Sequence, residues 1–194
     1  AFGDLDPAVF LLDWRTWNGG PCGLADSMQD DPAYEMLVAA CDAANNGDPQ
    51  SAVEALVEAA QQTENQDLLA HLTAIVGLST AVLGDLASAA EAFESGVAIN
   101  LALNQPWELT VSLHNLASVW ITLEDERALG VIQQLDDLHE QFYDEAGNRL
   151  LQANIARAFN DQGQLEDTRG FFEENGLPQL GIIDAWLDEM ENGQ

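Results

Sequence analysis

The chain has 194 residues, 47% of them hydrophobic, and a formal net charge of −29, because 34 Asp and Glu residues face only five Arg and no Lys. A chain of this length and apolar content can bury a core as one domain or a short repeat array, so we expect it to be folded. Phosphate backbones and anionic lipids are bound through clustered Lys and Arg, and the charge argues against nucleic acid and membrane surfaces as partners. No apolar run approaches the roughly 18 residues that span a bilayer, so we expect no membrane insertion.

The acidity leaves three interpretations open. A high-salt habitat fits the missing Lys, because dense carboxylates stay hydrated while concentrated salt screens their repulsion. A mimic of nucleic acid that occupies a basic protein is the second interpretation, and simple solubility is the third. The first residue is Ala1 rather than Met, which leads us to expect a removed signal peptide rather than a trimmed chain. The expected location is therefore extracellular or at the cell surface, with the cytoplasm of a salt-tolerant microbe as the alternative.

Residues 1–31 form an N-terminal arm with an apolar, aromatic stretch and then a Gly19-Gly20-Pro21 break. A flexible, Gly-rich joint lets this arm, with its expected short helix, fold back as a cap or reach a neighbouring molecule. Cys22 lies in the arm and Cys41 in the first long helix that follows. A disulfide between them would tie the arm to the rest of the chain, and two free thiols are the alternative.

Helical periodicity governs the chain beyond the arm, and no segment alternates as a strand would. Apolar residues recur three and four positions apart through eight segments, which pair into four helical hairpins. The predicted helices are 33–46 and 49–62, 66–83 and 86–103, 106–123 and 126–142, and 146–161 and 165–175.

A turn phrase of Gly-Asp or a relative recurs between the helices of each pair. It is visible at Asn46-Gly47-Asp48, Leu83-Gly84-Asp85, Leu123-Glu124-Asp125 and Gln162-Gly163-Gln164. Two series of residues follow the turns at intervals of about 40 residues: Ala52, Ala89, Ala128 and Thr168, and then Leu56, Phe93, Ile132 and Phe172. A third series precedes the turns and supplies the small residues that close helix contact requires: Ala40, Gly77, Ala117 and Ala156.

These features resemble the tetratricopeptide repeat family, most plainly from Gly77 to Phe93. The resemblance covers roughly residues 33–175, and it implies an all-α solenoid of antiparallel helix pairs over 32–176. The repeats depart from the family because they exceed its usual length of about 34 residues. In addition, Glu124 stands in a Gly position and Thr168 in an Ala position. We therefore expect long helices and an irregular superhelix.

Residues 177–194 form a further amphipathic segment. Its apolar residues follow helical spacing and need a surface to pack against: Ile182, Ile183, Trp186, Leu187 and Met190. We expect either a capping helix on the last pair, as solenoids normally need, or a helix that docks on a neighbouring molecule.

Recognisable motifs for catalysis or metal binding are missing from the sequence. His71, His114 and His139 lie far apart and lack the spacing of metal ligands. No phosphate loop, Ser-His-Asp arrangement or Cys-His signature is present, so we expect neither an enzyme nor a cofactor. Acidic clusters such as 26–31 support only weak, diffuse binding of divalent cations.

Two kinds of protein-binding surface remain. The resemblance implies a concave groove formed by the first helices of the pairs, although the family's Lys-containing clamp for a peptide carboxylate cannot be present in its usual form. The residues expected to contact a peptide there are His71, His114, Asn115, Asn154 and Arg157. The apolar terminal segments imply an assembly interface made of Phe10, Leu11, Trp14, Trp17, Ile183, Trp186, Leu187 and Met190.

The preferred function is that of a non-enzymatic interaction and assembly protein, which polymerises with other copies of itself into an extracellular filament or tube through its terminal segments. Repulsion between subunits would make this assembly depend strongly on salt or cations. The alternative is a monomeric adaptor or chaperone, whose acidic concave groove holds a peptide or basic helix of another protein.

Overall fold

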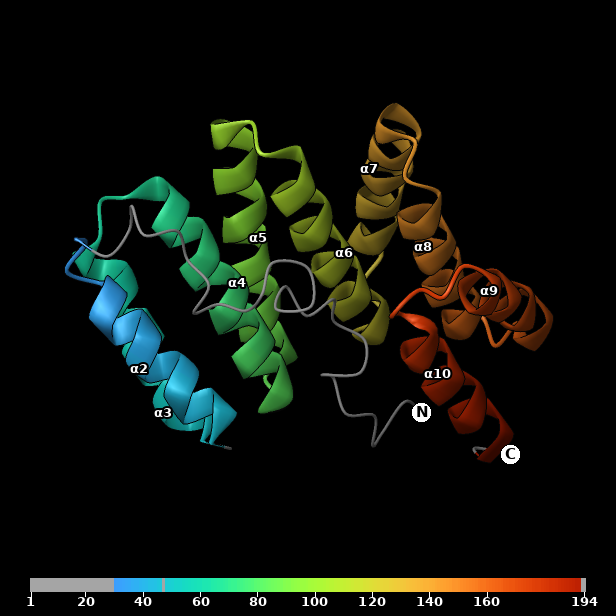
Figure 1. Cartoon of the computed structure of the whole chain (residues 1–194), viewed down its shortest axis with the longest axis horizontal. Coiled ribbons are helices and arrows are strands. Elements are labelled where there is room, and N and C mark those ends of the chain that lie inside the picture. Colours follow the sequence, from blue (N-terminus) through green and yellow to red (C-terminus); the bar gives the residue numbers. More distant parts are fainter. Residues whose placement is uncertain (1–29, 47, 193–194) are drawn as a thin grey trace. The chain divides into compact units, whose positions relative to one another are not determined.

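The computed structural model describes residues 30–46 and 48–192, and all regular structure in these residues is helical (Figure 1). The helices are α2 (Tyr34–Asn45), α3 (Pro49–Gln62), α4 (Gln66–Val82), α5 (Leu86–Leu103), α6 (Pro106–Thr122), α7 (Arg127–Phe142), α8 (Glu145–Ala158), α9 (Gln162–Glu174) and α10 (Leu180–Asn192). The prediction of an all-α chain is confirmed for this part of the sequence, and the helix bounds lie within a few residues of those predicted.

Six of the helices end on a residue with left-handed backbone, a conformation that Gly adopts most readily. These residues are Gly84, Asn104, Glu124, Tyr143, Asn160 and Gly176. The N–H that follows each one donates to the carbonyl five residues earlier, as from Asp85 to Thr80 at 3.0 Å and from Asp144 to His139 at 2.9 Å. This bond closes the last helical turn and stops the helix.

An Asp directly after the turn starts several of the next helices. The side chains of Asp85, Asp144 and Asp161 each accept the N–H of the residue three positions later, at 3.1, 2.9 and 3.1 Å. Such a bond satisfies one of the backbone donors that a helix start leaves without an intrahelical partner. The Gly-Asp phrase therefore ends one helix with its first residue and begins the next with its second.

The fourth turn lies earlier than the sequence pattern predicted. Because α8 ends at Ala158 and α9 begins at Gln162, Gly163 lies inside α9. Asn160 takes the left-handed conformation with φ 57°, and Asp161 caps α9. The prediction that Gln162-Gly163-Gln164 forms the turn is wrong, because Asn can serve in place of Gly at a left-handed position.

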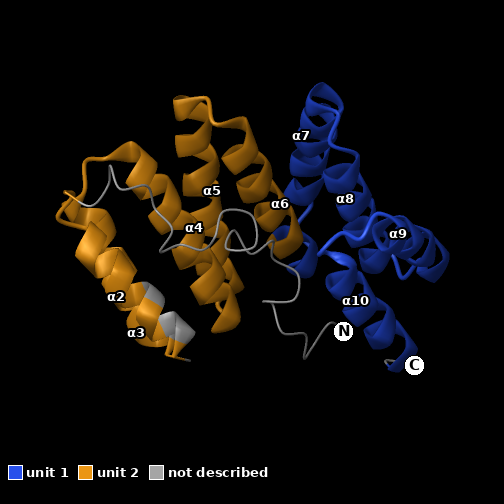
Figure 2. Cartoon of the chain, viewed as in Figure 1, with its two compact units in different colours: residues 1–5, 120–194 blue, residues 6–119 orange. Residues whose placement is uncertain are grey.

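The chain divides into two compact units, which Figure 2 shows in different colours. Of the described residues, unit 2 contains α2 to α5 and α6 up to Val119, whereas unit 1 begins at Trp120 and contains α7 to α10. Each unit has buried apolar side chains of its own. The four small residues predicted at helix contacts, Ala40, Gly77, Ala117 and Ala156, are all buried.

In unit 2, α4 and α5 pack closely because a glycine faces a phenyl ring. Phe93 is 1% exposed, and a Cβ added to Gly77 would lie 2.7 Å from its Cδ1. Real Cβ contacts are not that short, so the ring fits only against a bare backbone. Further along α5, Asn100 donates to the Ser112 hydroxyl of α6 at 3.0 Å.

In unit 1, α10 packs against α9 through both apolar and charged side chains. Ile183 and Trp186 are fully buried, and Arg169 of α9 donates to Asp184 of α10 at 2.6 Å. The guanidinium of Arg157 in α8 lies 5.5 Å from the centroid of the Trp186 ring.

None of the described helices combines the length and apolarity needed to cross a bilayer.

Candidate functional site

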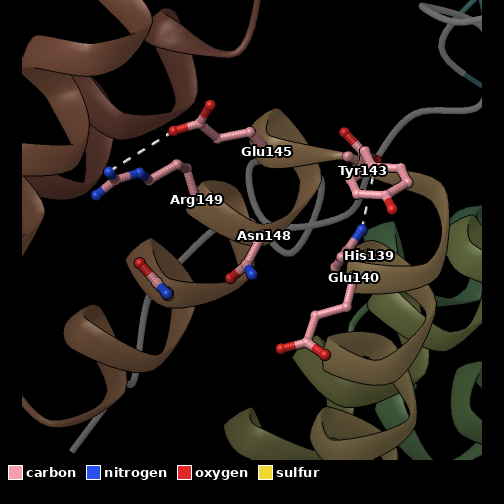
Figure 3. Close-up of a pocket in the computed structure, with 8 residues that line it drawn as sticks. His139, Glu140, Tyr143, Glu145, Asn148 and Arg149 are labelled. Carbon is pink, nitrogen blue, oxygen red and sulfur yellow. Dashed lines mark ion pairs between the residues drawn. The ribbon is translucent and has the colours of Figure 1, made fainter.

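A cavity of about 710 Å³ lies in unit 1, where α7 ends and α8 begins. Figure 3 shows the side chains that surround it. Its lining consists almost entirely of polar, charged and aromatic residues: His139, Glu140, Tyr143, Asp144, Glu145, Asn148, Arg149 and Gln152. A hollow with this lining suits a polar ligand better than an apolar one.

Tyr143, at the turn beside the cavity, has an unfavourable backbone conformation. It is the left-handed residue that ends α7, with φ 55°, and it is 93% exposed. A bulky L-residue in this conformation pays a steric penalty that Gly avoids. An exposed aromatic residue in a strained position is therefore not explained by packing.

His139 lies beneath the turn and is held by Asp144. The residue is 4% exposed, and its Nδ1 lies 3.3 Å from Oδ2 of Asp144. Gly147 makes room for this pair, because a Cβ there would come within 2.6 Å of His139 Nδ1. The carboxylate favours the tautomer with hydrogen on Nδ1, which leaves Nε2 as an acceptor.

The charge of His139 is set mainly by its burial. Desolvation lowers the pKa of the imidazole below its ordinary value of 6.5, and the charges of Asp144 and Asp136 oppose this effect without overcoming it. His139 is consequently neutral at neutral pH.

Apart from Oδ2 of Asp144, which lies 3.3 Å from His139 Nδ1, two buried polar atoms at the cavity have no hydrogen-bond partner among the described residues, namely Nε2 of His139 and Oδ1 of Asn148. Leaving such an atom without a partner costs about 1–3 kcal/mol. Both are acceptors, so the group that would satisfy them is a hydrogen-bond donor.

The charges around the cavity are predominantly negative. Glu140 and Glu145 are exposed carboxylates, and Asp144 adds a third. Arg149 is the one cation in the lining, but it lies 3.8 Å from Glu145, and its guanidinium is 5.5 Å from the Phe171 ring centroid. Its charge is thus partly compensated from within unit 1.

The structure places most of the residues predicted for a peptide groove in the interior. His114, Asn115, Asn154 and Arg157 are all buried, and His71 is half-buried. Burial also lowers the pKa of His71, against the charges of Glu108 and Asp67. In this structure the four buried side chains offer little surface to an external peptide.

Arg157 takes part in the contact between α8 and α10. Its Nε lies 3.7 Å from Oε2 of Glu189, and burial lowers the pKa of the guanidinium to about 10. Burial likewise raises the pKa of Glu189, because both groups lose solvation. Arg157 still carries its charge at neutral pH and neutralises Glu189 beside Trp186.

The residues predicted for self-assembly are divided between described and undescribed parts of the chain. Ile183 and Trp186 are fully buried, while Leu187 and Met190 are half-buried. The N-terminal set, Phe10, Leu11, Trp14 and Trp17, lies outside the described residues, as does Cys22. The side chain of Cys41 is also outside that part, so its disulfide with Cys22 stays a prediction.

The sequence alone does not connect His139 with Asp144, because a spacing of five residues across a turn matches no helical or metal-ligand pattern. A signal was present, since Tyr143-Asp144 occupies the place of the Gly-Asp phrase and Gly147 follows soon after. Within the part of the chain that the structure describes, no three His, Cys, Asp or Glu residues are grouped to hold a metal ion.

Comparison of the chain with models of protein families, with curated proteins and with solved structures found no match.

Proposed function

We propose that the chain is a non-enzymatic interaction protein with tetratricopeptide-like helix pairs, which binds a basic segment of another protein. The observation that carries this proposal is the state of the arginines. Each described Arg lies near a carboxylate of its own unit, with Arg127 2.8 Å from Asp125 and Arg169 2.6 Å from Asp184. Arg149 and Arg157 are 3.8 and 3.7 Å from Glu145 and Glu189.

The acidic side chains therefore outnumber the arginines that could neutralise them within the chain by a wide margin. The sequence has 34 Asp and Glu against five Arg, and the exposed carboxylates include Glu54, Glu58, Glu91 and Glu174. Such a field attracts a Lys- and Arg-rich segment and accelerates its encounter with the protein. The needed countercharge must come from solution ions or from a partner.

A hetero-partner is preferred over self-assembly on two grounds. Copies that each carry a charge of −29 repel one another unless salt screens them. Furthermore, the folded chain buries Ile183 and Trp186, which the assembly hypothesis assigns to contacts between subunits. Burial of these side chains supports the capping alternative for α10.

The test is a titration of the full chain with a peptide of alternating Arg and Ala, followed by calorimetry at low salt and at roughly physiological ionic strength. We expect saturable binding that weakens with salt, and no binding of a Glu-Ala peptide of the same length. A flexible polyglutamate of matched charge serves as the control. The proposal fails if the protein does not bind the basic peptide. It also fails if polyglutamate binds the basic peptide with the same affinity and stoichiometry as the protein does.

A further inference from the structure

The cavity between α7 and α8 combines three features that belong to recognition of a planar cation. The first is the pair of acceptors without partners, His139 Nε2 and Asn148 Oδ1. His139 is buried and lines the cavity, and a neutral imidazole held by Asp144 keeps Nε2 free of hydrogen.

The second feature is the aromatic side chain on the rim. Tyr143 is 93% exposed and holds a left-handed backbone at φ 55°, although five other helix ends use Gly, Asn or Glu at that position. The face of a tyrosine ring attracts a cation, and a guanidinium can stack on it. The strain at Tyr143 is then the cost of presenting this ring beside the cavity.

The third feature is the negative charge. Three carboxylates line the cavity against one guanidinium, and that guanidinium already lies near Glu145. Figure 3 shows Glu145 and Arg149 together on one side, away from Tyr143 and His139 on the other. A phosphate or another anion would meet repulsion from Glu140 and Asp144, so the lining selects against anions.

We propose that this cavity binds a guanidinium group, donated by an arginine of the basic segment that the protein recognises. The inference rests on the proposed function and assigns its site. Five donors in a flat fork allow a guanidinium to serve both acceptors and Glu140 while stacking on Tyr143, whereas an ammonium group lacks the flat face. Both acceptor atoms are buried, so binding requires the side chains around them to move.

The probe is a basic peptide with one central arginine among lysines, compared with the same peptide carrying citrulline or lysine at that position. Citrulline keeps the shape of arginine and removes its charge. We expect the arginine peptide to bind tightest and to shift the NMR signal of the His139 ring, which a His139→Gln variant identifies among the three histidines. Free arginine amide, tested in parallel, separates a small-molecule ligand from a protein segment, and tighter binding of the amide than of the peptide would contradict the protein source.

Two variants with matched controls test the site itself. Tyr143→Gly should weaken arginine-peptide binding about two- to five-fold, as expected for an exposed cation–π contact, while the melting temperature stays equal or rises. Glu124→Gly is its control, because Glu124 is also an exposed left-handed residue (φ 56°) but lies at the turn before α7. Glu140→Gln should also weaken binding, and Glu126→Gln, at the opposite end of α7, should change it less.

The outcomes separate the two proposals. Binding of the basic peptides with no preference for arginine over citrulline, and with no loss in Tyr143→Gly or Glu140→Gln, would overturn the site while the proposed function stands. Absence of binding to every basic peptide would overturn both. If the control variants lose as much affinity for the peptide, the net negative charge of the protein accounts for binding, and this result would also overturn the site.

Discussion

The α4–α5 and α7–α8 contacts each depend on a glycine, but the two contacts serve different purposes. In each, a glycine on one helix makes room for a ring from the other, with Gly77 against Phe93 and Gly147 against His139. The first ring is apolar and closes the interior of unit 2, whereas the second is an imidazole paired with Asp144 beside a hollow. Close approach of helices thus stabilises one contact and supports a polar site at the other.

The largest expected effect breaks the apolar contact. Phe93→Ala should lower the free energy of unfolding by about 3–5 kcal/mol, because it removes a buried ring and leaves a cavity. Phe159→Ala is the matched control, since Phe159 is 78% exposed and its truncation should change stability by less than about 0.5 kcal/mol. Urea unfolding followed by circular dichroism measures both, and similar losses in the two variants would contradict the packing described for α4 and α5.

A smaller loss is expected from the glycine side of the same contact. Gly77→Ala should cost about 1–3 kcal/mol, because the new methyl group overlaps the Phe93 ring and forces the helices apart. Gly130→Ala in α7 should instead stabilise the chain by about 0.5–1 kcal/mol, since nothing lies within 4 Å of a Cβ at that helical position. Opposite signs in thermal melts would establish that Gly77 is required for packing; a gain in both would refute it.

The α7–α8 turn should respond in the other direction. Tyr143→Gly removes the steric penalty of the left-handed conformation and should raise the free energy of unfolding by about 1 kcal/mol. A loss of stability in denaturant titration would mean that the exposed ring makes a stabilising contact, and it would contradict the steric penalty assigned to Tyr143.

The smallest effect concerns pH. Because burial lowers the pKa of His139 in the folded chain, protonation favours the unfolded state. The contribution of His139 is therefore complete above its ordinary pKa of 6.5 and is lost as pH falls through and below that value. Titration of the ring by NMR should give a pKa below 6.5, and Asp144→Asn should lower it further by removing the opposing charge. A pKa above 6.5 would show that Asp144, rather than burial, dominates.

The helices were predictable because their signals are local. Turn residues such as Gly84-Asp85 combine a left-handed helix end with an N-cap, and both act within a few residues of sequence. The position predicted for the fourth turn is wrong for the same reason. Gly163 matches the local pattern, whereas Asn160 supplies the left-handed helix end and Asp161 the N-cap. The all-α fold follows from these patterns and from apolar periodicity.

The candidate site was not predictable to the same degree. It depends on the depth of His139, on the space left by Gly147 and on two acceptors without partners, and none of these properties is written in residue spacing. Burial is likewise not evident from spacing, because Asn154 and Arg157 follow helical spacing and are buried in unit 1. Identity and spacing reveal which residue types are present, whereas burial decides which of them a ligand can reach.

The burial of the arginines also determines how trypsin would digest the folded chain. Trypsin cleaves after Arg and Lys, and the sequence contains no Lys. The side chain of Arg127 is 61% exposed just after a turn, whereas that of Arg157 is 6% exposed in the last turn of α8. Among the four described arginines, cleavage after Arg127 should come first, and cleavage after Arg157 should require α8 to separate from α10. The rate of tryptic cleavage after Arg157 therefore reports on local opening of unit 1.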